Sequence, residues 1–266
     1  MPGSRRRSRP WPRSAEEPNC VVSFTAPTRG PGTGPRTLWE QESTPAVPGA
    51  LPPRCQASLP TDARSLIHLP RVEVWEVELV QDEPLLRRLR TLLPQSDLAR
   101  ADRFKRSGAA ERWIVARAAL RILLCTRLEC IPEDVVIEVA EHGKPYLPGS
   151  SLQFNVSHSG DRALIVLSDQ LEVGVDIERP GRNAGAVGRA LSEAERAGGD
   201  DLLQLWCRKE AWAKALGGGL GWAPERFDTT RVEGYALTDL TLGEGYRGAL
   251  AVEGASADHA FCKLSL

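Results

Sequence analysis

Alternating apolar and polar positions predict short strands over much of the chain from about residue 70 onward. The segment RVEVWEVEL (71–79) alternates Val72, Val74, Val77 and Leu79 imperfectly with charged residues, as a half-exposed strand does. Further short strands are predicted at 135–139, 152–156, 163–167 and 172–178, and near the C-terminus at about 231–242, 246–252 and 259–265. The pattern therefore favours small sheets.

Two helical blocks interrupt these strands. Apolar residues recur at helical spacing from about Ser96 to Leu128, and Ser107-Gly108 is expected to divide this block into two helices. The second block begins at Ser192, which has capping-box spacing with Glu195, and resumes from about residue 201 to 216. The order strand, long helix, strands thus occurs twice. We expect an α+β protein of two similar fused halves, each a small sheet packed with a long helix.

The first part of the chain differs in composition. Residues 1–60 hold 12 of the 20 prolines and show little regular apolar spacing. Such a segment buries too little apolar surface to offset the entropy of ordering it. We expect 1–69 to be a disordered Pro/Arg-rich extension, followed by an N-terminal half at 70–168 and a C-terminal half at 169–266. The two-half pattern favours a monomer that contains its own pseudo-dimer.

Composition restricts the partners. The formal net charge is −1, which gives no bulk attraction to nucleic acid or to anionic membranes. No apolar run approaches the roughly 18 residues that a membrane helix needs. The six cysteines include no CxxC pair, and with four histidines they give no zinc spacing. We expect a cytoplasmic protein without nucleic-acid or membrane binding, in which any phosphate recognition comes from a local basic cluster.

Two carboxylates lie on the predicted strand 172–178. Asp176 and Glu178 are two residues apart, so they project from one face while Val175 and Ile177 pack on the other. Two like charges that close together repel unless a cation lies between them, and hard oxygen ligands of this kind suit Mg²⁺. The alternative is an exposed strand edge with two solvated acids.

The segment LWCRKEAWAKALGGG (205–219) predicts a helix that places Trp206, Glu210 and Lys214 near one stripe. A carboxylate and an ammonium are then neighbours one turn apart. The alternative is an ordinary surface pair worth about 0.3–0.5 kcal/mol.

Two further segments carry polar groups at turns. In FNVSHSG (154–160), Ser157, His158 and Ser159 end a strand before Gly160, an arrangement that forms either an anion cradle or a structural histidine. In HGKPYLP (142–148), Lys144 could meet a phosphate as a point charge.

The motifs HGKPYLP, FNVSHSG, VGVDIE and WCRKEAWAK, in this order and spacing, resemble the successive signature motifs of the Sfp-type 4'-phosphopantetheinyl transferases over about residues 70–266. The resemblance implies a pseudo-twofold α+β fold with coenzyme A between the halves. It also implies Mg²⁺-dependent transfer of the phosphopantetheine arm of coenzyme A to a serine of an acyl or peptidyl carrier protein, with release of 3',5'-ADP. Such carriers serve fatty acid, polyketide or nonribosomal peptide synthesis.

The resemblance further implies residue roles near the reacting phosphate. Asp176, Glu178 and Glu210 match the carboxylates that bind the metal. Glu210 also matches the residue proposed as general base toward the incoming serine. Lys214 resembles the lysine that contacts the pyrophosphate, and His158 resembles the histidine that contacts phosphate oxygens of coenzyme A. Glu210, Lys214 and His158 are thus the catalytic candidates.

A second set is implied for the 3'-phosphate and adenine side of coenzyme A. Its members are polar or basic residues and one proline: Arg100, Arg103, Arg112, Lys144, Pro145 and Ser157. Asp97 stands where a second lysine is expected from the resemblance, so the composition of this pocket edge differs from the family pattern.

Two other classes of function are compatible with parts of the sequence. A non-catalytic binding module for coenzyme A or a carrier protein would be marked by loss of an acid or of Lys214, and neither is lost. An unrelated Mg²⁺-nucleotide enzyme is disfavoured because the chain has no GxxxxGK[ST] loop.

Overall fold

The structure is a computed structural model that describes residues 20–23, 72–181, 184–199, 201–218, 228–254 and 259–266. Its strands are β1 (Cys20–Ser23), β2 (Val72–Glu78), β3 (Glu138–Val139), β4 (Pro145–Tyr146), β5 (Gln153–Ser159), β6 (Arg162–Ser168), β7 (Val173–Glu178), β8 (Tyr235–Leu240), β9 (Arg247–Glu253) and β10 (His259–Ser265). Its helices are α1 (Glu83–Arg90), α2 (Gln95–Ala101), α3 (Ala109–Leu128), α4 (Ala184–Arg189), α5 (Glu193–Ala197) and α6 (Leu202–Ala215), with a 3-10 turn at Pro132–Asp134.

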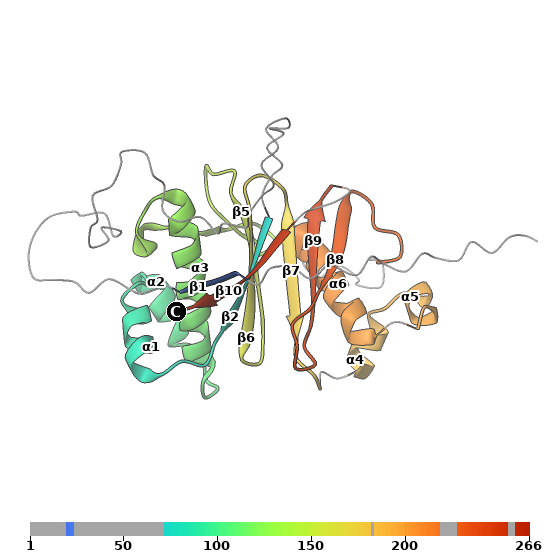
Figure 1. The fold of residues 1–266 in the computed structure, drawn as a ribbon, viewed down its shortest axis with the longest axis horizontal. Helices are drawn as coiled ribbons and strands as arrows, with labels where there is room; N and C mark the ends of the chain where they lie inside the picture. Colours follow the sequence, from blue (N-terminus) through green and yellow to red (C-terminus); the bar gives the residue numbers. More distant parts are fainter. Residues whose placement is uncertain (1–19, 24–71, 182–183, 200, 219–227, 255–258) are drawn as a thin grey trace, which may run out of the picture.

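Two main sheets form the centre of the protein. The first has the order β1-β10-β2-β6-β5 and the second has the order β7-β9-β8. β10 runs parallel to both β1 and β2, whereas the other neighbours in these two sheets are antiparallel. Helices α1–α3 cover the outer side of the first sheet and α4–α6 cover the outer side of the second (Figure 1). The expected α+β architecture of small sheets and helices is therefore confirmed.

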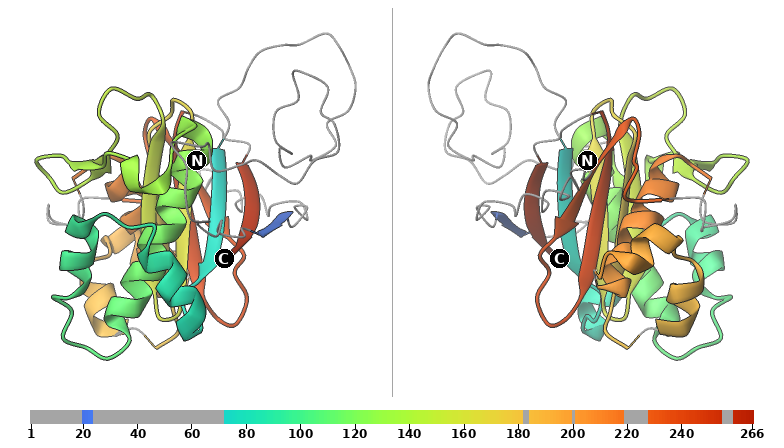
Figure 2. Two further views of the ribbon diagram at one scale, coloured as in Figure 1. Left: turned by 90° about the vertical axis from the view of Figure 1, so that its left-hand side faces the viewer. Right: turned by 90° about the vertical axis from the view of Figure 1, so that its right-hand side faces the viewer.

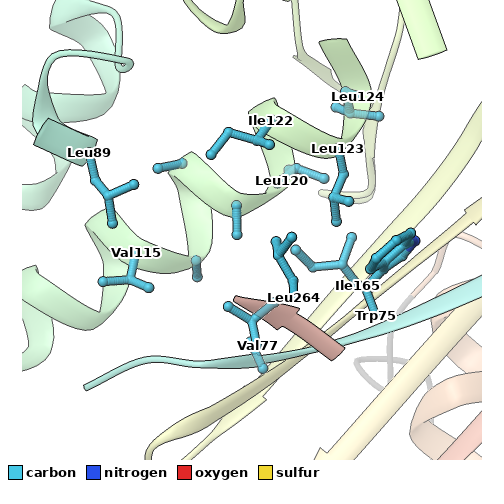
Figure 3. Close-up of a cluster of buried hydrophobic side chains, with 14 of the residues drawn as sticks. Trp75, Val77, Leu89, Val115, Leu120, Ile122, Leu123, Leu124, Ile165 and Leu264 are labelled. Carbon is cyan, nitrogen blue, oxygen red and sulfur yellow. The ribbon is translucent and has the colours of Figure 1, made fainter. Parts of the chain in front are cut away.

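The largest core lies between α3 and the first sheet. Alternate residues of β2 and β6 point to the helices, because side chains of a strand alternate between its faces. Figure 3 labels ten members of this core: Trp75, Val77, Leu89, Val115, Leu120, Ile122, Leu123, Leu124, Ile165 and Leu264. Since α3 is enclosed by the sheet and by its helical neighbours, apolar residues occur around most of its circumference.

A second core lies between the two sheets. The other faces of β2 and β6 contribute Val74 and Val166, and the facing strand β7 contributes Val173, Val175 and Ile177. β2 and β6 are thus buried on both faces, which explains why the apolar residues of β2 do not alternate strictly with its charged ones. A smaller cluster of mostly alanines joins α6 to the outer face of the second sheet.

The predicted division of the helical block 96–128 into two helices is confirmed. Gly108 precedes α3 with φ of +72°, a conformation that glycine adopts without strain, and α2 has already ended at Ala101. Helix α1 was not predicted, although Asp82 caps it and Pro84 lies in its first turn. The strand predicted at 135–139 is reduced to two residues.

The N-terminal extension was expected to be mostly disordered. Within it, Cys20–Ser23 form β1 beside β10 at the edge of the first sheet (Figure 2). The rest of the extension lies outside the described residues. None of the described helices combines the length and the apolar character that crossing a bilayer requires.

Candidate functional site

The strand β7 separates its apolar and acidic side chains onto two faces. Val175 and Ile177 are buried between the sheets. Asp176 and Glu178 lie on the opposite face, against α6, and retain only 3% and 8% of their exposure. The predicted division of the strand is confirmed, and the alternative of two solvated acids on an exposed edge is wrong.

Helix α6 lies unusually close to β7. A β-carbon at Gly174 would be 2.0 Å from the carbonyl oxygen of Ala211 and 2.4 Å from the amide nitrogen of Ala215. Only glycine permits this approach, and the two helix residues that face it are small. The contact brings the C-terminal half of α6, with Glu210 and Lys214, over the acidic face of the strand.

The ammonium of Lys214 is directed at the first of the strand acids. Its Nζ donates to Asp176 Oδ1 at 2.6 Å, to Ser157 Oγ at 2.9 Å and to the carbonyl of Val175 at 3.3 Å. Ser157 in turn donates to Asp176 Oδ1 at 2.7 Å. Because the Asp176 carboxylate is buried, these charge-assisted bonds offset much of the cost of removing it from water.

A pocket of about 260 Å³ opens over this network. It is lined by Val156, by Ser157, which was expected on the 3'-phosphate and adenine side, and by the five residues expected near the reacting phosphate: His158, Asp176, Glu178, Glu210 and Lys214. These side chains come from β5, β7 and α6, which are far apart in the sequence. The pocket thus combines three acids, a lysine, a histidine and a hydroxyl, a set suited to an anionic ligand with a cation.

The donor chemistry of the pocket fits a hard divalent cation. Asp176 Oδ2 is buried and has no hydrogen-bond partner among the residues that the structure describes. A cation coordinated there would satisfy it. Within the same described residues, no three His, Cys, Asp or Glu side chains are gathered tightly enough to form a metal site by themselves. Mg²⁺ does not need such a cage, since it commonly takes one or two carboxylates together with phosphate oxygens and waters.

Comparison with known proteins adds independent information. A family model described as the 4'-phosphopantetheinyl transferase superfamily matches residues 172–259, and one described as the N-terminal part of 4'-phosphopantetheinyl transferase matches residues 81–170. The chain is 34% identical over 173 residues to the 4'-phosphopantetheinyl transferase AcpT of Escherichia coli K12, covering 60% of this chain and 79% of AcpT. The chain belongs to the 4'-phosphopantetheinyl transferase superfamily.

Other relatives in this superfamily extend the match. The 4'-phosphopantetheinyl transferase HetI of Nostoc is 32% identical over 165 residues, which cover 56% of this chain and 70% of HetI. The L-aminoadipate-semialdehyde dehydrogenase-phosphopantetheinyl transferase of the mouse is 28% identical over 164 residues, or 53% of each chain. The resemblance inferred from the four motifs is confirmed, and the protein is an enzyme of the phosphopantetheinyl transferase class.

The arginines expected at the 3'-phosphate lie apart from the acidic pocket. Arg100 and Arg103 line a separate pocket of about 510 Å³ with Ser96 and Phe104. The Arg100 guanidinium also lies 4.7 Å from the ring centre of Trp113.

Arg112 lies on α3, where its Nε donates to Asp161 Oδ1 at 2.8 Å. Neither pocket as described includes Arg112 in its lining.

Asp97, which departs from the family pattern, has a structural role. Its side chain is buried and its Oδ2 accepts hydrogen bonds from Nε of Arg117 at 3.0 Å and Nε of Arg121 at 2.7 Å. The acid therefore ties α2 to α3 and is directed into the protein. The sequence offered no local signal for this, because the two arginines follow 20 and 24 residues later, on a different helix.

Lys144 is also held by the protein itself. Its Nζ donates to Glu172 at 2.5 Å and to the carbonyl of Ala215 at 2.8 Å, at the C-terminal end of α6. A cation at this end is favourable because it complements the helix dipole. Pro145 begins β4 and is half-buried. Neither residue is among those that line the acidic pocket.

Sequence reasoning missed the surroundings of Glu195. The predicted capping box is confirmed, since Ser192 and Glu195 exchange both hydrogen bonds. However, the Glu195 carboxylate also pairs with Lys209 at 2.7 Å and accepts two bonds from Thr229. Both Glu195 and Lys209 side chains are completely buried. Lys209 directly precedes Glu210, so this pair anchors α6 beside the pocket.

Proposed function

We propose that this enzyme transfers the 4'-phosphopantetheine arm of coenzyme A to a serine hydroxyl of an acyl or peptidyl carrier protein and releases 3',5'-ADP, with Mg²⁺ as cation. The observation that carries the proposal is the single pocket that gathers Ser157, His158, Asp176, Glu178, Glu210 and Lys214 from three separate elements. The superfamily assignment supports the same class of reaction.

Asp176 and Glu178 are the residues that would hold Mg²⁺, and Glu210 would complete the set. The buried, unpartnered Asp176 Oδ2 among the described residues supports this assignment. When bound, Mg²⁺ supplies a Lewis acid for the pyrophosphate and counters the charge that develops on the leaving group.

Lys214 contributes a second positive charge. In the proposed reaction the serine oxygen of the carrier forms a bond to the phosphorus that bears pantetheine, and the bond from that phosphorus to the bridging oxygen of 3',5'-ADP breaks. The Lys214 ammonium, already fixed by Asp176 and Ser157, is placed to neutralise or protonate that oxygen. The exposed His158 binds a phosphate oxygen at the rim of the same pocket.

Glu210 accepts the proton of the incoming serine, directly or through a water. A carboxylate that coordinates a metal is a weaker base, so its metal role ranks above its base role. Glu210 is partly exposed in the pocket, which supports access of the carrier serine to its carboxylate.

Four basic residues and one proline outside the acidic pocket are proposed to bind the 3'-phosphate and adenine side of coenzyme A. These are Arg100, Arg103, Arg112, Lys144 and Pro145. The two arginines that line the second pocket are exposed and available to an anion. Arg112 and Lys144 would have to give up their ion pairs with Asp161 and Glu172 to bind the ligand. Their contribution to the free energy of coenzyme A binding is therefore smaller by the free energy of those ion pairs.

The two halves at 70–168 and 169–266 are proposed to be related by a pseudo-twofold axis. Strand orders β2-β6-β5 and β7-β9-β8 support this, since in each half the third strand lies between the first two. We further propose that the enzyme is monomeric and cytoplasmic, with carriers of fatty acid, polyketide or nonribosomal peptide synthesis as partners.

The test is a labelling assay. The full chain is incubated with a fluorescent coenzyme A analogue, Mg²⁺ and a panel of apo carrier domains, and the carriers are resolved by gel electrophoresis. We expect Mg²⁺-dependent labelling of at least one carrier, and its loss in Asp176→Ala with the circular dichroism spectrum retained. Labelling of no carrier, with coenzyme A binding intact, would instead favour the non-catalytic binding module.

A further inference from the structure

The two main sheets meet along β5 and β7, which are edge strands of different sheets. Three β5 side chains on one face accept hydrogen bonds from alternate backbone amides, two in β7 and one in the residue that follows it. Asn155 Oδ1 accepts from Val175 N at 3.1 Å, Ser157 Oγ from Ile177 N at 3.4 Å, and Ser159 Oγ from Arg179 N at 3.1 Å. We call these three contacts the polar seam. Side chains at every second residue thus perform the task that backbone carbonyls perform within a sheet.

The two serines of the polar seam each make a second bond. Ser157 Oγ donates to Asp176 Oδ1 at 2.7 Å, and Ser159 Oγ donates to Glu178 Oε2 at 2.8 Å. Each serine therefore joins one carboxylate of β7 and the amide of the residue that follows it. At the Asn155 contact the corresponding β7 residue is Gly174, which has no side chain. The seam holds two acids with one repeated geometry.

A hydroxyl in this position fixes the direction of its proton. The amide N–H of Arg179 donates to the Ser159 oxygen, which leaves the single O–H proton for the Glu178 carboxylate. Glu178 is 8% exposed, so this charge-assisted bond is shielded from competing water. The Ser159 hydroxyl is held by the amide of Arg179, so the position of this bond to Glu178 is set by how the two sheets are aligned.

We infer that Ser159 is a positioning residue that orients the Glu178 carboxylate toward the cation of the active site. The inference rests on the proposed function, in which Glu178 is a cation ligand. Partners that orient a metal ligand raise cation affinity because the ligand no longer loses rotational freedom on binding. The family resemblance places Ser157 on the coenzyme A side but gives Ser159 no role.

The test compares Ser159→Ala and Ser159→Thr in the full chain. Mn²⁺ is titrated into each protein by calorimetry in the absence of coenzyme A, and the Mg²⁺ concentration for half-maximal transfer is measured separately. We expect Ser159→Ala to weaken Mn²⁺ binding and to raise the Mg²⁺ half-saturation about 10-fold. Ser159→Thr, which keeps the hydroxyl, should restore both, and the KM for coenzyme A at saturating Mg²⁺ should stay within about twofold.

Asn155→Ala is the matched control. It removes a contact of the same polar seam at the position without a carboxylate, so it should lower the melting temperature with cation affinity within about twofold of wild type. Ser159→Cys, which keeps a weaker donor, should give an intermediate affinity.

Wild-type Mn²⁺ affinity in Ser159→Ala, or equal loss of affinity in Asn155→Ala, would overturn the role of Ser159. Failure of the wild-type chain to label any carrier would overturn the proposed function instead, because cation binding is measured without coenzyme A. A wild-type chain that binds no Mn²⁺ but still transfers would overturn the inference alone.

Discussion

Gly174→Ala is expected to inactivate the transferase by moving a helix. The added β-carbon would lie 2.0 Å from the carbonyl oxygen of Ala211 and 2.4 Å from the amide nitrogen of Ala215. Both atoms belong to the backbone of α6, so no side-chain rotation relieves the overlap. The helix must withdraw from β7 by at least about 1 Å before these distances approach normal van der Waals contact.

The displacement would carry the pocket residues with it. Lys214 adjoins Ala215, and its 2.6 Å bond to Asp176 would lengthen as the helix withdraws. A misplacement of about 1 Å can cost roughly 100-fold in rate. Overpacking a core costs about 1–3 kcal/mol, which for a domain of this size corresponds to about 2–12 °C in Tm.

The assay is carrier labelling for kcat/KM, with differential scanning fluorimetry for Tm. Gly188→Ala in α4 is the control, because a β-carbon there meets no described atom within 4 Å. This substitution should leave kcat/KM within about twofold and keep or raise Tm, since alanine favours a helix over glycine. Wild-type kcat/KM in Gly174→Ala would refute the reasoning, because the position of α6 over the pocket would then not require glycine at residue 174.

Three further predictions concern stability. Ile177→Val should cost about 0.5–1.5 kcal/mol in urea unfolding without loss of transfer, because the side chain is buried between the sheets, and an inactive but stable variant would contradict this. Lys209→Met should cost about 3–5 kcal/mol by the same method, since it leaves the fully buried Glu195 without its ammonium partner. Partial desolvation alone would raise the pKa of Asp201, but hydrogen bonds from Arg247 and the first amides of α6 outweigh it and lower the pKa. The Asp201 carboxylate therefore stabilises the fold fully above about pH 4, and this stabilisation is lost as the pH falls through the lower folded pKa. The free energy of unfolding of Asp201→Asn should accordingly equal that of the wild type only in acid. A difference that persists at low pH would contradict this.

Local patterns in the sequence were sufficient for several parts of the site. The two faces of β7 follow from the two-residue period, because a strand with Val175 and Ile177 in a core must place Asp176 and Glu178 together. The cap formed by Ser192 is likewise a short-range property, set within one turn. Such features depend on residues within a few positions of each other, which is where sequence patterns carry the most information.

Other parts depend on partners that are remote in the chain. Asp97 is buried because Arg117 and Arg121 return to it from α3, and Lys144 is engaged because Glu172 and the end of α6 meet at its ammonium. Long-range pairing decides these roles, and charge alone does not indicate it.

The polar seam is a further contact between remote segments that the sequence does not indicate. Asn155 and Ser157 alternate with Phe154 and Val156 as in any half-exposed strand, and His158 precedes Ser159. Yet the side-chain oxygens of Asn155, Ser157 and Ser159 accept hydrogen bonds from backbone amides of β7 and of Arg179 directly after it. Which surface the polar face meets is decided by how the sheets pack, and the resemblance supplied motifs for the pocket but not this contact.

The parallel pairing of β10 with β2 has a consequence for synthesis of the chain. His259 to Leu264 lie between β1 and β2 in the first sheet and pair with Val72 to Val77, which were made about 190 residues earlier. At 5–20 residues per second, a ribosome makes the partner strand roughly 10–40 s after β2 has emerged. During that interval β2 must remain without its final neighbour, an open edge to which other chains can add. The last eight residues are therefore needed to finish the first half of the protein, and a premature stop there should produce aggregation before it produces an inactive enzyme.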